Sequence, residues 1–449
     1  MRNGTKFILI CCYALIAAPR EEYKRAFQKS ATLGVGKSLR IEHSLGSLNI
    51  RTHPGSELNI QATIRCSARA AAEARVCTDR IQISVDESST GVSVRTVYPR
   101  NEGRSNLSFG ADYDIVMPEN APLDVRNRFG SVSVANLQAA SGINNANGRV
   151  TFSGGRGRQR IENSFGDVDV RGNDGEVTVR NTNGNVAASD ISGAVDITNR
   201  FGATRVANAG RGLMIHSNNG NIEADNIGGI STITNSFGRV IVTEAKGDVT
   251  VDNQNGAVQA TGITGAAHLN TSFDKINATR IGKGLTVHAQ NSTVTADSVG
   301  ESAVVETSFG NADLRRVKGG VRVTARNSPV RLVGIGGEVY AKTSFAGIDV
   351  SDAVGAITVE NQNGHVMVET KSGQRCQPVS LSTSFGPIRV SIPPGTGYNV
   401  TARTSFGRVH SNHEITISGG ISPDALTGKI AGGGCELRLM GQNGNIDIL

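Results

Sequence analysis

The chain has 449 residues and a net charge of +7, and 55 of its residues are glycine while none is tryptophan. Such a glycine-rich composition, with many asparagine, threonine, valine and isoleucine residues, favours strands and tight turns and disfavours a mainly helical fold. The positive charge is mild over so long a chain, so it permits attraction to anionic envelope polymers without requiring it.

The N-terminus has the pattern of an export signal. A basic start is followed at residues 7–18 by an uncharged, mostly apolar run of 12 residues, which predicts a signal peptide over residues 1–19. The run is too short to cross a bilayer as a helix, so no transmembrane span is expected. The alternative is an intracellular protein with a wrongly placed start. Residues 20–36 are predicted to be a linker, and for the charged residues 20–30 a short helix is the alternative.

The cysteines predict disulfides rather than a metal site. Cys11 and Cys12 lie in the apolar run, which leaves Cys66 and Cys77 near one end and a second pair, Cys376 and Cys435, near the other. An even number of cysteines in an exported chain suggests two disulfides, one at each end. Zinc-finger spacing of cysteine and histidine is missing from the sequence, so no metal is predicted.

Residues 37–122 predict an N-terminal β region that caps the next part of the chain. Apolar residues alternate with polar ones in several short runs, as in half-buried strands. The alanine-rich residues 67–80 are expected to form one helix or a long loop. Residues 31–38 fit the loose phosphate-loop pattern, but an alternating strand pattern follows where that motif needs a helix. We therefore interpret the match as chance and predict no cofactor.

From Leu123 onward a repeat dominates the chain. Phenylalanines recur every 36 residues without drift, at Phe129, Phe165, Phe201, Phe237, Phe273, Phe309 and Phe345. Asparagines stand midway between them, at Asn147, Asn183, Asn219, Asn255, Asn291, Asn327 and Asn363. Aligned at 18 residues, a second column begins Asn127, Asn145, Asn163, Asn181 and Asn199, beside an apolar column. A strict period without insertions is typical of stacked identical units.

The 18-residue period predicts an all-β solenoid with one coil per 18 residues. Each coil would pair with those above and below, and the inward asparagines would form a ladder of mutually bonded amides. We expect the phenylalanines to fill the core or a corner in alternating large and small layers; exposed platforms for nucleic-acid bases are the disfavoured alternative. Recurrent glycines mark a corner that needs positive φ. A propeller of about 40-residue blades does not fit 18 residues, and hairpins would give antiparallel neighbours.

The regular solenoid is predicted to span residues 123–371. Beyond it, residues 372–449 contain several prolines and two Ser-Phe-Gly motifs that break the 36-residue spacing. We expect irregular turns there, with loops that interrupt the coil and a C-terminal cap, because open strand edges recruit other chains.

A search for chemistry in stacked columns finds no catalytic set. The best local cluster is Asp252, Asn270, His288 and Glu306, successive members of one outward column, with His268 beside Asn270. Such a set is compatible with a metal or acid–base site, yet a solvated polar face is the favoured interpretation. The basic runs at Arg156, Arg158 and Arg160, and at Arg315, Arg316 and Lys318, are likewise interpreted as solvated turns. No catalytic, cofactor-binding or metal-binding residue is assigned.

The recurring Asn-Ser-Phe-Gly-x-Val-x-Val and Asn-x-Asn-Gly-x-Val units, with Asp114-Ile-Val-Met-Pro118 before them, resemble a known family. It is the bacterial adhesin-like β-strand-repeat family, related to the head domains of autotransporter adhesins. The resemblance covers residues 37–449 and implies a right-handed parallel β-helix in an exported or envelope protein. It supplies no catalytic residues. This chain departs from the family in its very regular spacing and in losing glycine at four corners.

Together these observations predict a non-catalytic, exported or cell-envelope protein that presents a long rigid surface for binding or structure, in the periplasm, outer envelope or outside the cell. The expected partner is an envelope polymer, a glycan or another protein, and not a nucleic acid. The alternative is an enzyme on an extended polysaccharide, of the lyase or hydrolase type, which would need acidic or basic residues aligned on one face. A regulatory or scaffolding module without a polymer ligand is a third hypothesis.

Overall fold

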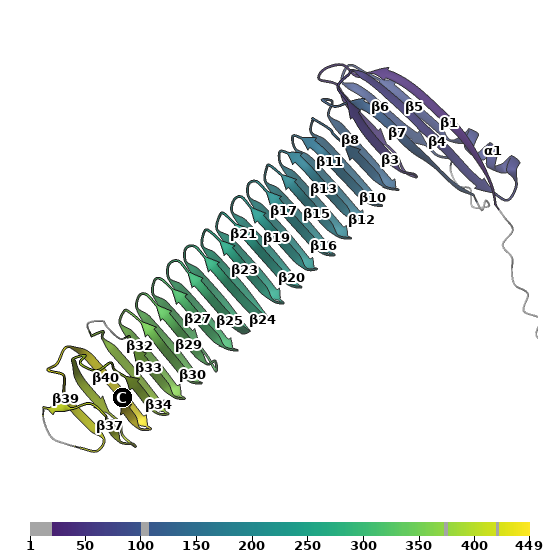
Figure 1. Ribbon diagram of the computed structural model, residues 1–449. Helices are drawn as coiled ribbons and strands as arrows, with labels where there is room; N and C mark the ends of the chain where they lie inside the picture. The colour runs from purple at the N-terminus through teal and green to yellow at the C-terminus, as the bar shows by residue number, and fades with distance from the viewer. Residues whose placement is uncertain (1–19, 100–106, 372–375, 419–421) are drawn as a thin grey trace, which may run out of the picture.

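The structure is a computed structural model that describes residues 20–99, 107–371, 376–418 and 422–449. The signal peptide predicted for residues 1–19 lies outside the described part. The described residues form 41 strands and one helix, and most strands stack into a rod with a broader N-terminal region at one end (Figure 1). No helix in this part of the chain is both long enough and apolar enough to cross a membrane.

The rod is a parallel β-solenoid of about 15 coils with a turn of about 18 residues, as the period predicts. Each coil contributes one strand to a first face and the next strand to a second face, and the two faces form two layers. Asn163 pairs in parallel with Asn181, and Asn181 with Asn199, so positions 18 apart lie directly on one another.

The regular coils have the following strands. The first face contains β8 (Leu123–Phe129), β10 (Ser141–Asn147), β12 (Gln159–Phe165), β14 (Val177–Asn183), β16 (Val195–Phe201), β18 (Leu213–Asn219), β20 (Ser231–Phe237), β22 (Val249–Asn255), β26 (Ala303–Phe309), β28 (Val321–Ala325), β30 (Val339–Phe345), β32 (Ile357–Asn363) and β34 (Val379–Phe385). The second face contains β9 (Val132–Ala135), β11 (Val150–Arg156), β13 (Val168–Asp174), β15 (Val186–Ile191), β17 (Thr204–Ala209), β19 (Ile222–Ile227), β21 (Val240–Ala245), β23 (Val258–Ile263), β27 (Ala312–Val317), β29 (Val330–Ile335), β31 (Ile348–Ala353), β33 (Val366–Thr370) and β35 (Ile388–Ser391). The long strands β24 (Ala267–Ile281) and β25 (Leu285–Val299) each pass from one face to the other.

The core lies between the two faces and consists of small aliphatic side chains. Ile161, Val179 and Ile197 are fully buried and stacked in one column. At the far end of this column the register stays unbroken, because Val323 pairs with Ala341. Each coil thus adds the same layer to one continuous apolar core.

The buried asparagines mainly hold the corners. Asn163 donates its amide Nδ2 to the carbonyl of Gly166, and the same bond from Asn181 to Gly184 recurs one coil later. The predicted ladder of hydrogen bonds between amide side chains forms only between some neighbouring coils, for example from Asn181 Nδ2 to Asn199 Oδ1 at 3.4 Å. The Oδ1 of several of these asparagines, Asn181 included, has no partner in the described part of the chain. The ladder is therefore incomplete, and the recurrent bond is the one that closes the corner.

Threonine takes over this role where asparagine disappears. Thr271 donates its hydroxyl to the carbonyl of Gly256, and Thr307 and Thr343 donate to the corresponding corner carbonyls of Ser292 and Ser328. Alanine occupies the position on the intervening coils, as Ala289 and Ala325, so between residues 271 and 343 a side chain donates to the corner only on alternate coils.

The N-terminal region extends both faces, first with parallel pairs and then with antiparallel pairs. Its elements are β1 (Glu21–Thr32), β2 (Ser38–Glu42), β3 (Leu48–His53), β4 (Glu57–Ala68), α1 (Ala71–Arg80), β5 (Gln82–Glu87), β6 (Gly91–Val97) and β7 (Ser108–Pro118). The order β1–β4–β7–β3 continues the second face, and β5–β6–β2 continues the first. The segment expected to be a linker or short helix is strand β1, and residues 38–42 form a strand where a phosphate loop would need a helix.

Helix α1 confirms one of the two alternatives for residues 67–80, and it is fastened to the sheet in two ways. A disulfide joins Cys77 in α1 to Cys66 in β4, as the cysteine count predicts. Arg25 in β1 donates to the carbonyls of Thr78 and Ile81 at the C-terminal end of the helix, at 3.0 and 2.7 Å.

The C-terminal strands stack out of chain order. They are β36 (Tyr398–Arg403), β37 (Val409–Ser411), β38 (Ile415–Ile417), β39 (Ala425–Ile430), β40 (Cys435–Asn443) and β41 (Ile446–Ile448). The last coil in sequence, β40 and β41, lies between the coil of β34 and β35 and that of β36 and β37. A disulfide between Cys376 and Cys435 fastens this arrangement, again as predicted. The chain therefore does leave the regular winding here, yet the stack continues through it.

Candidate binding surface

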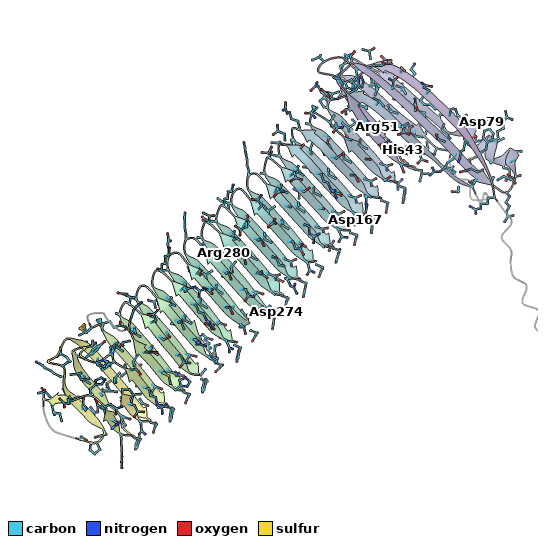
Figure 2. The ribbon with its side chains drawn as sticks, in the orientation of Figure 1. His43, Arg51, Asp79, Asp167, Asp274 and Arg280 are labelled. Carbon is cyan, nitrogen blue, oxygen red and sulfur yellow. A yellow bond between two sulfur atoms is a disulfide. The ribbon has the colours of Figure 1, made fainter. Side chains whose placement is uncertain are left out.

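A column of phenylalanines runs along one edge of the rod, exposed to solvent. Every ring is between 41% and 75% exposed: Phe129, Phe165, Phe201, Phe237, Phe273, Phe309, Phe345, Phe385 and Phe406. The prediction that these rings fill the core or a corner interior is therefore wrong. We call this column the phenylalanine edge. Asp167 and Asp274, which follow two of these rings closely in sequence, mark it in Figure 2, and Arg280 lies toward the opposite edge.

The local geometry explains why the rings point outward. Strand alternation would place Phe165 inside with Ile161 and Asn163, but the chain bends at this point. The next residue, Gly166, has φ of 123°, and a Cβ there would lie 2.4 Å from the carbonyl oxygen of Gly148 in the preceding coil. Because the backbones of successive corners lie this close together, no space for a side chain remains inside the corner. The phenylalanine ring therefore points outward. The bond from Asn163 to the Gly166 carbonyl closes the bend around the phenylalanine.

Along the edge, phenylalanine and asparagine alternate coil by coil. Phe165 pairs with Asn147 on one side and Asn183 on the other, and the same order recurs up to Asn363 next to Phe385, with Asn327 standing at a turn outside the strands. Four of the asparagine side chains are held by the backbone: Asn147 Nδ2 donates to the carbonyl of Arg128, and Asn255, Asn363 and Asn443 donate to equivalent carbonyls. Successive rings are thus two coils apart, or about 9.6 Å at the usual strand spacing.

The residue that directly precedes each ring is seldom charged. Serine precedes seven of the nine phenylalanines, and arginine precedes the other two, Phe129 and Phe201. In those two the guanidinium lies over the ring, 5.9 and 5.5 Å from its centroid, and these rings are the two least exposed. The other seven rings follow a serine, so each has a hydroxyl group beside it and no guanidinium from the preceding residue over it.

The carboxylate that stands just beyond a corner glycine on this edge, Asp167, is neutralised locally. It accepts hydrogen bonds from the backbone N–H of Asn185 at 2.9 Å and from Arg149 at 2.8 Å. These two bonds, the backbone one first, hold the pKa of Asp167 below its ordinary value. The edge therefore combines exposed aromatic rings, amides and hydroxyls with scattered charges, among them the exposed Arg239, Asp274 and Lys275.

The cluster singled out in the sequence lies on the first face, away from this edge. Asp252, Asn270, His288 and Glu306 stack in one column as predicted, and Asn270 bonds to Asp252 at 3.2 Å while His288 bonds to Glu306 at 3.1 Å. The His288 and Glu306 side chains are more than half exposed. Within the described ranges no group of three or more histidine, cysteine or acidic residues is placed to hold a metal ion.

The two basic runs are largely paired. Arg156, Arg158 and Arg160 form ion pairs with Asp174, Glu176 and Glu162. In the second run Arg315 pairs with Asp313, and Arg316 with Asp297. Partners on the same or the adjacent coil neutralise these arginines, which supports the interpretation as solvated surface rather than polyanion sites.

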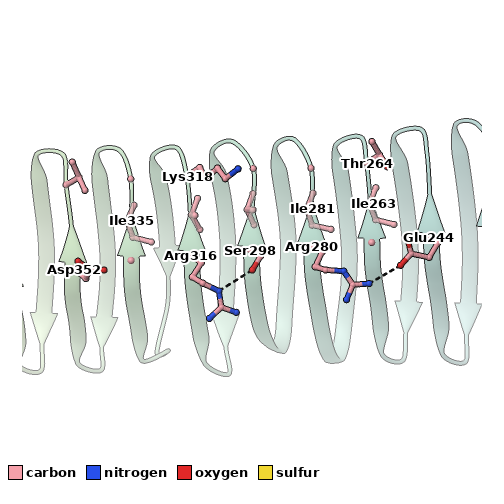
Figure 3. A pocket seen from close by; sticks show the side chains of 18 of the residues that line it. Glu244, Ile263, Thr264, Arg280, Ile281, Ser298, Arg316, Lys318, Ile335 and Asp352 are labelled. Carbon is pink, nitrogen blue, oxygen red and sulfur yellow. Dashed lines mark hydrogen bonds and ion pairs between the residues drawn. The ribbon is translucent and has the colours of Figure 1, made fainter.

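A shallow groove of about 910 Å³ runs along the edge opposite the phenylalanines (Figure 3). Its floor is the glycine-rich turn backbone, and several of its charged side chains are paired, as in Arg280 with Glu244 at 2.9 Å and Lys371 with Asp352 at 2.9 Å. These two carboxylates are the acidic residues of its lining. They stand six coils apart, or about 29 Å at the strand spacing, whereas a glycoside hydrolase needs two within about 10 Å.

The family profile described as Toastrack DUF4097 matches residues 211–449. The chain belongs to this family. The match supports an adhesin-like β-repeat protein, and the same coil continues without a break from residue 211 back to Leu123, so the family's repeat unit describes most of the rod. No curated protein matches the chain.

A solved structure was also found: a crystal structure of a proposed cell adhesion protein from Clostridium sporogenes. It is 9% identical, with 94% of this chain and 99% of that chain covered and a TM-score of 0.16. The fold described above rests on the strand pairing of this chain alone.

Proposed function

We propose that this protein is a non-catalytic, exported, adhesin-like solenoid whose phenylalanine edge is its binding surface. The observation that carries the proposal is the line of nine exposed rings in one register. Burying a phenylalanine side chain contributes about 1.5–3 kcal/mol, so a protein that leaves nine of them in water retains apolar surface for a partner. Single exposed apolar residues are common on protein surfaces, but nine in one regular line form a repeated apolar feature that a partner can engage.

The rod suits a binding role because it holds its groups rigidly. Each phenylalanine is placed by a corner that a buried asparagine or threonine closes, as in Asn163 to Gly166. Groups fixed before binding lose less entropy when a ligand arrives. The register of the rings therefore presents a fixed pattern rather than a flexible patch.

Export is supported by the two disulfides, one at each end, since such bonds persist in oxidising compartments. The absence of catalysis is supported by the wide separation of Glu244 and Asp352 in the groove. Kinship to autotransporter head domains belongs to the same proposal and rests on the sequence motifs.

The test is co-sedimentation of the purified chain with cell-envelope fragments of the source cells. A triple variant, Phe237→Ala, Phe273→Ala and Phe309→Ala, should reduce binding at least tenfold. Met214→Ala with Met367→Ala is the matched control, because it removes two equally exposed apolar side chains from the two faces instead of the edge. Equal binding by the triple variant and the wild type would contradict the proposal, and so would release of products from a polysaccharide.

A further inference from the structure

Resting on that proposed function, the geometry points to a ligand class: we propose that the phenylalanine edge binds an extended, uncharged β-1,4-linked glycan. One disaccharide unit would lie across each pair of coils. The ring of every second sugar would stack on a phenylalanine, and the sugar between would face the intervening asparagine.

The repetition of identical sites favours a repetitive linear ligand. From Phe129 to Phe345 the rings follow one another every two coils over twelve coil spacings, or about 58 Å. A globular partner has no such period and would need only a few anchoring groups at the centre of its contact. A polymer with a regular repeat engages every site in the same way, and its affinity grows with the number of sites engaged.

The spacing and the alternation fit the geometry of a β-1,4-linked chain. Successive sugars in such a chain are rotated by half a turn, so an equivalent ring face recurs once per disaccharide, close to the spacing of about 9.6 Å between rings on this edge. An aromatic ring stacks well on the C–H face of a sugar, which is apolar, and poorly on its rim of hydroxyls. Phenylalanine on every second coil matches that alternation, whereas phenylalanine on every coil would not.

The polar groups on the edge complete the site. An asparagine whose Nδ2 is fixed by a backbone carbonyl, as Asn147, Asn255 and Asn363 are, retains an amide oxygen that can accept a hydrogen bond from a sugar hydroxyl. The serines before seven of the rings add hydroxyl groups of their own. Hydroxyl and amide groups suit a neutral polyol better than a charged chain.

Two other polymers or partners fit less well. Single-stranded nucleic acid stacks on aromatic rings but also needs a basic groove along its phosphates. The cations on this edge, such as Arg149, Arg239 and Lys275, are scattered and interspersed with Asp167 and Asp274, so they form no such groove. A second protein, including a second copy of this chain, normally contacts a contiguous apolar centre. On this edge an asparagine interrupts the apolar surface at alternate coils.

The first experiment measures binding of the full chain to microcrystalline cellulose and to chitin by co-sedimentation, and to cello- and chito-oligosaccharides of two to eight sugars by calorimetry. Binding should strengthen at each added disaccharide, and the triple variant Phe237→Ala, Phe273→Ala and Phe309→Ala should bind at least tenfold more weakly. Met214→Ala with Met367→Ala should bind as the wild type does. Thermal melts should be nearly unchanged, since the rings are half exposed.

The second experiment keeps the number of rings and changes only their spacing. Phe237→Asn with Asn255→Phe, and Phe309→Asn with Asn291→Phe, would place three rings on consecutive coils around Phe273. Loss of glycan binding in this variant supports the matched repeat. Binding as strong as that of the wild type would show that mere apolarity suffices and would overturn the inference.

Other outcomes separate this inference from the proposed function. If neither cellulose nor chitin binds, while envelope fragments bind in a phenylalanine-dependent way, the glycan assignment is wrong and the binding edge stands. Phenylalanine-dependent binding of poly(U), or phenylalanine-dependent dimerisation in sedimentation velocity, would also overturn the glycan assignment. If no phenylalanine-dependent binding to the envelope occurs, both proposals fail.

Discussion

Replacing His43 should remove a pH dependence from the stability of the N-terminal region. His43 is 4% exposed and lies between strands of both faces, with Nδ1 3.1 Å from the hydroxyl of Thr96. That hydroxyl is 2.6 Å from the hydroxyl of Tyr113, whose ring meets the imidazole edge-on at 5.0 Å. Burial lowers the pKa of His43 to about 4. Burial raises the pKa of Tyr113 to about 12, so this neighbour stays uncharged in acid.

The magnitude follows from linkage between protonation and folding. The pKa is about 4 in the folded state and about 6.5 when unfolded, and each unit corresponds to about 1.4 kcal/mol. Between these values the unfolded state binds more protons, so stability rises with pH. The contribution of His43 is complete above about pH 6.5 and is lost as the pH falls through about 4. The loss amounts to about 3.5 kcal/mol at most.

Amide hydrogen exchange, corrected for the intrinsic rate at each pH, measures this locally in β2, β6 and β7. In the wild type, the free energy of opening obtained from exchange should fall steeply between pH 6.5 and 4. In His43→Gln this free energy should fall less, by the amount that His43 contributes to stability. His216→Gln, which changes an exposed histidine on β18, is the control. An identical pH profile for wild type and His43→Gln would refute the assignment of the effect to this buried imidazole.

Three further changes test the solenoid itself. Asn199→Leu should destabilise its coil by about 1–3 kcal/mol, because the Gly202 carbonyl loses its donor; denaturant unfolding checks this, and no change would mean that water replaces the amide. Ile197→Asp should abolish folding, since an unpaired charge would enter the core; an unchanged thermal melt would show that the side chain does not face inward. Cys66→Ser with Cys77→Ser should release helix α1 and lower stability by about 2–3 kcal/mol, measured as faster proteolysis at residues 69–80.

The solenoid could be predicted because its register repeats in the sequence. An insertion-free period of 18 fixes which residues stack, and Asn163, Asn181 and Asn199 lie where that period puts them. The two disulfides followed from the number of cysteines. These features depend on spacing alone, which a sequence states directly.

The orientation of the phenylalanines could not be obtained in the same way. Counting alternate residues from Ile161 places Phe165 inside, but the bend begins before Phe165 and reverses the side it faces. The available signal was the glycine that follows, since a residue next to a positive-φ corner no longer obeys strand alternation. In strand β1 the alternation was present but hidden among charges, for Arg25, Phe27 and Ala31 are its partly buried positions.

The C-terminal end gives an independent reason to regard the phenylalanine edge as a functional surface. Phe385 and Phe406 follow each other along the chain, and Asn443 comes last, so the sequence shows no alternation there. In space strand β40 inserts between the two coils, and Asn443 pairs with both Phe385 and Phe406. If the alternation of phenylalanine and asparagine only reflected duplication of the sequence repeat, it would be lost where the strands no longer stack in chain order. The alternation of ring and amide persists across the break, so its regularity belongs to the folded surface, where a ligand with the same period would meet it.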